Sequence, residues 1–474
     1  MPVTSKSIPS KFLRQAAAAL VLCVACLAQT GCPSLLAGPN NLPNVLVIVV
    51  DTLRADRVGA FGNEQGLTPN LDALAANATV YRNAYPLSSW TKPSMASLWT
   101  SRYPAQHGVV DFDMQMPESE TTVPELLENA GYLTAGFQGN VLLTARHGFS
   151  KGFGYYITFG TEPDGTGPKK PHELAEVLNR EALHWVDAST RPWWKRRPRL
   201  LYLHYMEPHS PLDPDPEIWR ETATKKDHRD VEDLNNRFLV SRIYPQPEDV
   251  WFEIHEAYNA QVKGLDRDIG RLVDELRTRG FLDNCIIVVT SDHGEHLGEH
   301  GMAGHGLSLH GEETHVPFFI ASPDQKLRRD IDGPVSHIDF APTLLGLIGL
   351  TPPAAFEGRD LATTADGSSG VAYSSLQQTH RKQEPKAHER IAHTASLVSN
   401  QYRLLRPADG TISVERLADG SGKLAPPPSP EDVDSLTAVL NQIGVAGSRN
   451  PSPVVTKKID DDMKTKLKAL GYLN

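Results

Sequence analysis

Four apolar runs recur along the chain, at residues 44–50, 199–205, 284–290 and 316–322. They are rich in β-branched and aromatic residues, which favour strands. Their apolar residues are largely continuous and do not alternate with polar ones. This pattern is typical of strands that are covered on both faces, as in a parallel sheet.

Segments between these runs have helical spacing. Residues 68–78 (TPNLDALAANA) begin with Thr-Pro, a helix-start signal, and residues 255–280 place apolar positions on one helical face before a terminal glycine. Strands that alternate with helices predict the α/β class with a mainly parallel sheet. The polar, proline-rich residues 161–250 are interpreted mostly as surface insertions around a site.

The apolar pattern weakens after about residue 365, which predicts a main domain at 44–365 and a smaller α+β subdomain at 366–474. In this subdomain, residues 410–420 (GTISVERLADG) predict short strands with turns. Residues 426–434 (PPPSPEDVD) predict a loop, and residues 460–473 predict a terminal helix with an acidic start.

Residues 1–43 have the pattern of an export signal and tether. Three basic residues precede the apolar run 16–28, which is too short to span a bilayer comfortably. Cys32 follows Thr30-Gly31 and resembles a bacterial lipoprotein cleavage site, although Gln29 departs from it. We expect export to the bacterial cell envelope, with Cys32 as a candidate lipid anchor at the membrane surface. The alternative is an ordinary small residue in a cleaved signal.

The amino-acid composition of the chain limits the kinds of molecule that it is expected to bind. The 474-residue chain is 40% hydrophobic and 22% charged, has a net charge of −10, and contains no long Lys/Arg run. These values suit a globular protein and exclude general nucleic-acid binding. Only Cys285 of the four cysteines lies beyond the signal region, so no intrachain disulfide is expected in the mature body.

Metal-ligating residues follow two of the predicted strands. Asp51 ends the run 44–50, and Asp292-His293 follow the run 284–290. In open α/β sheets, ligands bind beyond the carboxyl ends of the strands. Asp51 alone would be read as a turn or cap residue, but together with Asp292-His293 it indicates a metal site.

Seven segments resemble the sulfatase family, part of the alkaline phosphatase superfamily, and occur in the family's order: NVLVIVVDTLRADRVGAFG, TPNLDALAANATVYRNAY, SSWTKPSMASLWTSRYPAQHG, DRDIGRLVDEL, VVTSDHGEHLGEHGMAGHG, HVPFFI and DFAPTLLGLIGL. The resemblance covers about residues 44–360. It implies a large mixed, mainly parallel sheet between helices, a divalent metal, and chemistry on an anionic sulfate or phosphate ester.

The resemblance implies metal-binding roles for Asp51, Asp292 and His293 and places Thr91 at the nucleophile position, where it also contacts the metal. Three oxygens and one imidazole suit one Ca²⁺, Mg²⁺ or Mn²⁺ ion better than a closed zinc site. Thr91 precedes a predicted helix, whose first N–H groups could receive an anion.

The resemblance also implies roles for residues around the ester. His209 matches a histidine that protonates or binds the ester, and His305 stands where many members have an anion-binding lysine. Asn140 matches another anion-binding position after a one-residue shift, and His107 matches a structural position. Six histidines within 293–315 leave a second metal as an alternative to surface or substrate-facing roles.

Three positions depart from the sulfatase pattern. Thr91 replaces the cysteine that is oxidised to formylglycine, Met95 replaces the supporting arginine, and Thr52 replaces a second acidic residue. No formylglycine is expected. A threonine nucleophile resembles that of phosphoglycerol transferases and nucleotide pyrophosphatases, and predicts a covalent phospho-threonine. The alternatives are a true sulfuric ester hydrolase and an inactive binding protein with the same fold.

Overall fold

A central eight-stranded sheet organises the computed structural model. Its strands, from one edge to the other, are β11 (Asp330–Ser336), β2 (Thr79–Tyr85), β10 (Phe318–Ala321), β7 (Cys285–Thr290), β1 (Asn44–Val50), β6 (Arg199–Tyr205), β4 (Leu133–Gln138) and β5 (Tyr155–Thr158). The structure describes residues 42–159, 171–190, 197–224, 230–241, 246–324, 330–376, 395–407, 409–418, 423–446, 449, 451–456, 460, 461 and 463–465.

The sheet is mixed because of one strand. β1 is parallel to both of its neighbours, β6 and β7, whereas β10 runs antiparallel to β7 and β2. All of Val45–Val50 is buried, which confirms the prediction that this continuous apolar run is covered on both faces. The predicted α/β class with a mixed, mainly parallel sheet is therefore confirmed.

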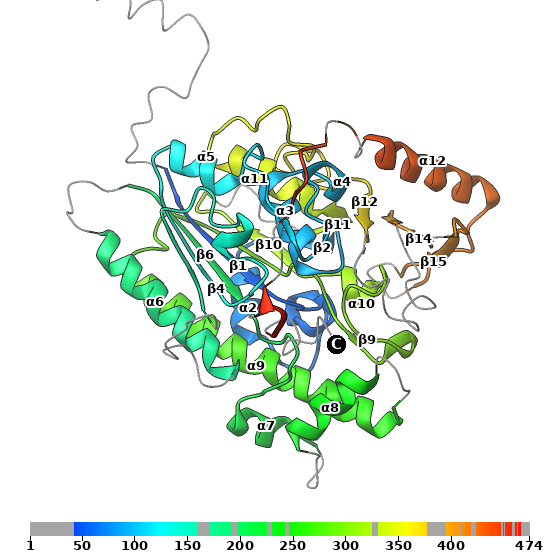
Figure 1. The fold of residues 1–474 in the computed structure, drawn as a ribbon, viewed down its shortest axis with the longest axis horizontal. Coiled ribbons are helices and arrows are strands. Elements are labelled where there is room, and N and C mark those ends of the chain that lie inside the picture. Colours follow the sequence, from blue (N-terminus) through cyan, green and yellow to red (C-terminus); the bar gives the residue numbers. More distant parts are fainter. Residues whose placement is uncertain are drawn as a thin grey trace, which may run out of the picture. The chain divides into compact units, whose positions relative to one another are not determined.

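Helices cover both faces of the sheet (Figure 1). On one side lie α2 (Pro69–Ala75), α6 (Leu174–Ser189) and the long α9 (Glu248–Thr278); on the other lie α3 (Thr91–Thr100), α5 (Val123–Asn129) and α11 (Phe340–Leu347). Trp99 on α3 joins two elements, because its ring lies 5.0 Å from that of Tyr202 on β6 and 5.9 Å from that of Phe340 on α11. The sheet is thus held between two apolar layers.

The interpretation of residues 161–250 as surface insertions is wrong at α6. Leu178 and Val186 on this helix are fully buried in the same apolar core as α9. The helix is amphipathic, so its polar outer face gives the segment a surface-like composition. The shorter α7 (Pro216–Thr222) and α8 (Val231–Ser241) also lie against α9.

A separate antiparallel sheet lies in the C-terminal region, formed by β12 (Ala372–Ser375), β13 (Ala395–Val398), β14 (Tyr402–Arg406) and β15 (Ser413–Arg416). The loop predicted at 426–434 is wrong in its second half, because α12 spans Pro430–Ala446. Ser429 and Asp432 cap its start reciprocally, and proline is well tolerated at the first helical position. The division at 365/366 stays a prediction.

Short elements complete the arrangement around the sheet. They are α4 (Pro104–His107), α10 (Gly311–Thr314), β3 (Met114–Gln115), β8 (His296–Leu297), β9 (Ala303–Gly304) and β16 (Val455–Thr456). Within the ranges that the structure describes, none of the helices has both the length and the apolar character needed to cross a bilayer. The predicted signal, Cys32 and most of the predicted helix at 460–473 lie outside the described residues.

Candidate active site

Two neighbouring parallel strands bring the predicted metal ligands together. Val49 on β1 pairs with Thr290 on β7, so Asp51 and the pair Asp292-His293 leave the sheet at the same edge. One ligand atom from each of these three residues lies within 4.8 Å of the other two, and all three side chains are buried. Strand pairing alone therefore brings Asp51 beside Asp292 and His293, which follow it by 241 and 242 positions in the chain.

The oxygen atoms of the two carboxylates fit a cation. Asp51 Oδ1 and Asp292 Oδ2 are buried and have no hydrogen-bond partner. His293 Nε2 lies 3.7 Å from the first and 3.4 Å from the second. A buried carboxylate oxygen without a donor is costly, and a bound cation would remove that cost. The donor set of carboxylates, imidazole and hydroxyl suits a hard or borderline divalent ion.

The other oxygen of each carboxylate is held by the protein. Asn140 Nδ2 donates to Asp51 Oδ2 at 2.7 Å, and His204 Nε2 lies 3.0 Å from the same oxygen. The backbone N–H groups of Thr52 and His293 donate to Asp292 Oδ1 at 3.3 and 3.0 Å. These contacts fix the orientation of both carboxylates and leave one oxygen of each available.

His204 is a functional residue that the sequence analysis missed. Its Nδ1 lies 2.9 Å from the hydroxyl of Tyr202, so a buried chain runs from Tyr202 through His204 to Asp51. His204 pairs with Val49 across the sheet, one residue before the end of β1. The available signal was a histidine inside the otherwise apolar run 199–205, where a polar residue needs a partner.

The ring orientation of His293 is set by its neighbour in the chain. Nδ1 lies 2.9 Å from the backbone carbonyl oxygen of Gly294, which can only accept a hydrogen bond. Nδ1 therefore carries the proton, and the Nε2 lone pair faces Asp51 and Asp292. Metal-binding histidines commonly have this arrangement.

Thr91 is the first residue of α3, and its hydroxyl lies beside the same group. Thr91 Oγ1 is 3.2 Å from His293 Nε2, and Asn140 Nδ2 donates to it at 3.3 Å. Ser94, one turn further on, donates to the backbone carbonyl of Asp292 at 2.6 Å and ties the start of α3 to the carboxylate loop. The contacts of Asn140 are with Asp51 and Thr91, and anion binding by its amide stays a prediction.

The backbone is strained directly after Asp51. Thr52 has φ 59°, a left-handed conformation that is unfavourable for a β-branched residue. Its N–H donates to Asp292, and its carbonyl accepts a hydrogen bond from the Tyr258 hydroxyl at 2.7 Å. The strain is offset by these buried contacts, and the turn places an N–H donor against the second carboxylate.

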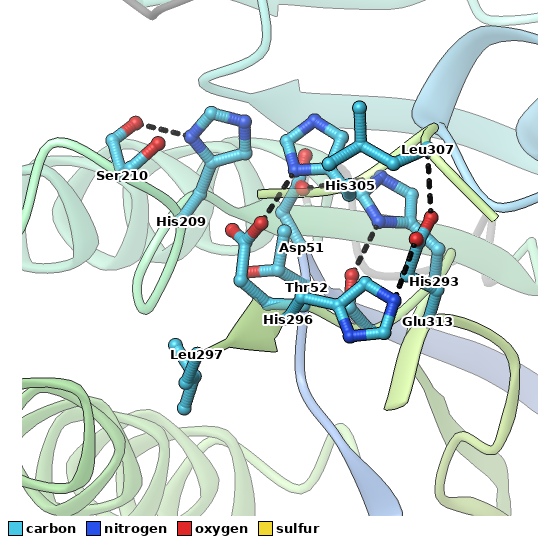
Figure 2. A network of polar contacts seen from close by, with 12 residues as sticks. Asp51, Thr52, His209, Ser210, His293, His296, Leu297, His305, Leu307 and Glu313 are labelled. Carbon is cyan, nitrogen blue, oxygen red and sulfur yellow. Dashed lines mark hydrogen bonds and ion pairs between the residues drawn. The ribbon is translucent and has the colours of Figure 1, made fainter. Parts of the chain in front are cut away.

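His209 and His305 lie side by side on the other side of the site, and His305 is next to His293 (Figure 2). His305 lies between the others, with ring centroids 4.5 Å from His293 and 4.9 Å from His209. His305 Nδ1 is 3.0 Å from Glu295 Oε1, and Glu295 is buried. His209 Nδ1 donates to the carbonyl of Ser210, which leaves its Nε2 as an acceptor. Glu295 was not predicted from the sequence.

Burial and neighbouring charges shift the pKa values of the site residues: that of Asp292 is raised, and those of Asp51 and His209 are lowered. Burial, reinforced by the charge of Asp51, raises the pKa of Asp292 to about 6. Burial opposes ionisation of Asp51 as well, but the hydrogen bond from His204 and the nearby imidazoles hold its pKa well below the ordinary value. Burial lowers the pKa of His209 to about 4. The pKa values of ionisable groups in this site are therefore shifted away from their ordinary values, as is common in active sites.

Met95 and His305 stand where the resemblance to sulfatases implies an arginine and a lysine. Met95 is fully buried, and Lys92 Nζ donates to the backbone carbonyl of Phe112 at 2.7 Å. The hydrogen bonds and ion pairs of Thr91, Asp51, Asp292 and His293 in the described structure involve neither lysine nor arginine. Histidines are the cationic candidates at this site.

The remaining histidines do not form a second metal group. His296 bonds to Glu313 at 3.0 Å, and the rings of His300 and His310 stack at 4.0 Å with an interplanar angle of 9°. A metal ion lies in the plane of each imidazole that binds it, so two parallel stacked rings cannot share one ion. Among the residues that the structure describes, the sole cluster with ligand spacing is Asp51, Asp292 and His293. His107 is buried against Ser97 on α3, 3.0 Å away.

Comparison with known proteins agrees with this geometry. The sulfatase family model matches residues 43–350, more than half of the chain. An uncharacterized sulfatase of Escherichia coli is 28% identical over an alignment of 352 positions, which covers 67% of this chain and 70% of that protein. An arylsulfatase of Clostridium perfringens is 27% identical over 387 residues, covering 67% of this chain and 77% of the relative.

A solved structure shows the same fold at lower identity. The crystal structure of a phosphonate monoester hydrolase of Agrobacterium radiobacter superposes with a TM-score of 0.68 at 17% identity and covers 88% of this chain and 100% of that one. At this identity the likeness concerns the fold. Together with the family match, which spans the elements that carry Asp51, Thr91, Asp292 and His293, it leads to one conclusion. The chain belongs to the sulfatase family and is an ester hydrolase of that family.

Proposed function

We propose that the protein transfers a phosphoryl or sulfuryl group from an anionic ester to Thr91 and then to water, at a single divalent metal. The observation that carries this proposal is the convergence of Thr91 Oγ1 with His293 Nε2, 3.2 Å away, beside two buried carboxylate oxygens that lack donors. A hydroxyl placed beside a metal ligand is in the position of an activated nucleophile.

The residues that would hold the ion are Asp51, Thr91, Asp292 and His293. A divalent cation bound there would lower the pKa of the Thr91 hydroxyl and offset negative charge on the transferred group. Ca²⁺, Mg²⁺ and Mn²⁺ suit this donor set better than Zn²⁺, which prefers more histidine or cysteine ligands. Asn140 and His204 would keep Asp51 in the binding orientation.

In the first step, Thr91 Oγ1 attacks phosphorus or sulfur, and the bond to the leaving alcohol oxygen breaks. Asn140 Nδ2 donates to Thr91 Oγ1, so the hydroxyl proton points elsewhere, and this proton passes to solvent as the new ester forms. His209 supplies a proton to the leaving oxygen once a bound anion has raised its affinity for one. An aryl leaving group needs this proton less than an alkyl one.

In the second step, water attacks the same atom and the bond to Thr91 Oγ1 breaks. His209 now takes a proton from the water, since its pKa of about 4 makes it a neutral acceptor at pH 7. Its Nδ1 is engaged with the carbonyl of Ser210, so the acceptor is Nε2. Thr91 recovers its hydroxyl proton from solvent, and sulfate or phosphate leaves from a monoester, whereas a phosphate monoester leaves from a phosphodiester.

We propose that phosphorus esters react at least as readily as sulfate esters. Thr91 cannot follow the formylglycine route, and a threonine ester of phosphate can be cleaved again by water. The second candidate, sulfuric ester hydrolysis, is favoured by relatives that are named as sulfatases, such as the arylsulfatase of Clostridium perfringens. One structural neighbour was solved in complex with its substrate, a disulfated glucosamine, and an anionic sugar ester is a further candidate here.

Intact mass spectrometry after incubation with a phosphodiester tests the nucleophile. We expect an adduct on the Thr91 peptide with the mass of the phosphoryl group plus the one ester substituent that the diester retains, and no adduct in Thr91→Ala. Thr100→Ala, a buried threonine later on the same helix, is the matched control and should keep the adduct. Turnover of aryl sulfate alone, unchanged in Thr91→Ala, would contradict the proposal. Absence of stoichiometric metal binding would favour the inactive binding protein.

We also propose that the protein is exported and attached to the bacterial envelope through Cys32. The support is the basic and apolar pattern of residues 1–28 followed by the small residues around the cysteine. In a bacterial host, the full chain should fractionate with membranes, and Cys32→Ser should release it into the soluble envelope fraction. Equal fractionation of both proteins would contradict the anchor.

A further inference from the structure

A row of polar side chains crosses the ends of three neighbouring strands beside the site. Thr158 ends β5, Gln138 ends β4, and His204 lies one residue before the end of β6. Gln138 pairs directly with Thr158 on one side and with His204 on the other, so the three side chains lie on the same face of the sheet. His204 contacts Asp51 at 3.0 Å, and the row therefore leads to the candidate site.

The side-chain amide of Gln138 is fully buried and is held in one orientation. Its Oε1 accepts from the backbone N–H of Asn140 at 2.6 Å, and its Nε2 donates to the backbone carbonyl of Leu143 at 3.2 Å and to Thr158 Oγ1 at 2.5 Å. A backbone N–H can only donate and a carbonyl can only accept, so these partners settle which end of the amide is the oxygen. Gln138 thus ties both Asn140 and Leu143 of the following turn to the end of β4.

This turn fixes the side-chain amide of Asn140. Asn140 Oδ1 accepts from the backbone N–H of Leu142 at 2.9 Å, and the backbone carbonyl of Asn140 accepts from the N–H of Leu143 at 3.1 Å. An asparagine that bonds to the backbone two residues later is a common turn-forming contact. Because Oδ1 faces Leu142, Nδ2 faces the site, where it donates to Asp51 Oδ2 at 2.7 Å and to Thr91 Oγ1 at 3.3 Å.

The hydroxyl of Thr91 depends on this arrangement because few groups hold it. In the part of the chain that the structure describes, the hydrogen-bond partners of Thr91 Oγ1 are Asn140 Nδ2 and His293 Nε2. The position of Asn140 therefore determines which side of the oxygen stays free to attack an ester. A displacement of about 1 Å at a reacting group can lower a rate by about a hundredfold.

We propose that Gln138 is a positioning residue for the nucleophile, which acts on Thr91 through the turn at residues 138–143 and through Asn140. The side-chain hydrogen bonds of Gln138 in the described structure go to Asn140, Leu143 and Thr158, so Gln138 influences Thr91 without touching it. The alternative is that Gln138 only stabilises the end of β4. This inference rests on the proposed function, because it names a residue that positions the proposed nucleophile.

Single-turnover measurements on Gln138→Met test this role. Methionine is close to glutamine in size and makes none of the three hydrogen bonds. The rate of adduct formation on Thr91 with a phosphodiester, measured by quenched-flow mass spectrometry, should fall by about tenfold. The inhibition constant of inorganic sulfate should stay unchanged, because Gln138 does not touch the ester. An unchanged rate, or an equal loss of rate and of sulfate affinity, would overturn the proposal.

Gln106→Met is the matched control. Gln106 is also buried and also ties a short turn, because its Oε1 accepts from the backbone N–H of Tyr103 at 2.9 Å and its Nε2 donates to Glu357 at 2.7 Å. Both variants should lower the melting temperature, but Gln106→Met should form the Thr91 adduct at the wild-type rate. An equal loss of rate in Gln106→Met would overturn the proposal, because the effect would then follow from lost stability.

Two changes at Thr158 test the same contact while Gln138 is kept. Thr158→Val removes the hydroxyl that accepts from Gln138 Nε2 and should slow adduct formation by about threefold, whereas Thr158→Ser keeps a hydroxyl and should recover most of the rate. Equal rates in Thr158→Val and wild type would overturn the proposal. Failure of the proposed function is distinguishable, because wild type would then form no Thr91 adduct, whereas failure of this inference leaves an adduct that forms equally fast in Gln138→Met.

Discussion

The two sides of the site are built differently. The metal side consists of Asp51, Asp292 and His293, which follow paired strands in the middle of the sheet. The histidine side consists of His209, Glu295 and His305, and these lie on irregular segments after β6 and between β7 and β10. Backbone hydrogen bonds between paired strands fix the positions of the metal-side residues. The histidine side depends instead on contacts between side chains, such as that of Glu295 with His305.

This difference indicates where each kind of chemistry can change. A carboxylate at the end of a central strand moves only if the sheet moves, so the metal side should tolerate little substitution. Side chains on loops can be exchanged with smaller consequences for the fold. The predictions below test this contrast between a rigid metal side and an adjustable histidine side.

The largest effect is expected for Asp292→Asn. Removing this charge should abolish stoichiometric metal binding and lower kcat by about a thousandfold or more, since a metal supplies several kcal/mol to such reactions. Metal content by mass spectrometry and initial rates would measure both. Asp339→Asn is the control, because Asp339 is also a buried carboxylate with a raised pKa of about 6. If the Asp292→Asn protein still bound stoichiometric metal, the metal side would not depend on this carboxylate as the contrast requires.

His209→Gln should lower kcat by about a hundredfold for an alkyl ester, which is typical of lost acid–base catalysis. The loss should be smaller for a nitrophenyl ester, whose leaving oxygen needs no proton. Metal content should stay unchanged, because His209 belongs to the histidine side. Equal losses for both esters would show that His209 does not serve the leaving group.

Metal affinity should depend on pH through Asp292. Its pKa is raised to about 6, so a proton competes with the metal below that value and not above it. Burial opposes protonation of His293, but the charges of Asp292 and Asp51 raise its pKa, so a proton on this ligand competes as well. Binding of Mn²⁺, measured by calorimetry, should therefore be about tenfold or more weaker at pH 5 than at pH 8. A constant affinity from pH 8 to pH 5 would be inconsistent with this buried, electrostatically raised carboxyl.

The smallest effect is expected for Tyr202→Phe. It removes the hydroxyl that holds His204, which in turn holds Asp51, so metal affinity should fall by about three- to tenfold. Tyr205→Phe is the matched control, because Tyr205 is a buried tyrosine of the same strand whose hydroxyl bonds to Asn179. Equal metal affinities in wild type and Tyr202→Phe would show that His204 needs no support from this hydroxyl.

The sequence predicted the features that depend on periodicity and chain order. The runs at 44–50 and 199–205 became central strands, and the family and the mixed α/β fold are confirmed. The reversed direction of β10 could not be read from its apolar residues, because both directions bury them equally. α6 was overlooked because its polar face dominates the composition of its segment.

The side-chain partners were beyond prediction from one sequence. Asn140 was expected to bind an anion, and its side-chain Nδ2 donates to Asp51 and Thr91. His204 and Glu295 gain their roles from residues 153 and 10 positions away, and no local pattern encodes such a pairing. From the sequence, Thr52 stood out because it replaces an acidic residue of the sulfatase pattern. In the structure, its backbone is in a left-handed conformation and its N–H donates to Asp292.

The position of Thr91 at the start of α3 separates two tasks that many enzymes combine. The nucleophile begins a helix, whereas Asp51, Asp292 and His293 follow the paired strands β1 and β7. One codon can therefore exchange the attacking group while the metal side keeps its geometry. We therefore expect that the residue at the start of α3 can be exchanged without refolding the core of the sheet.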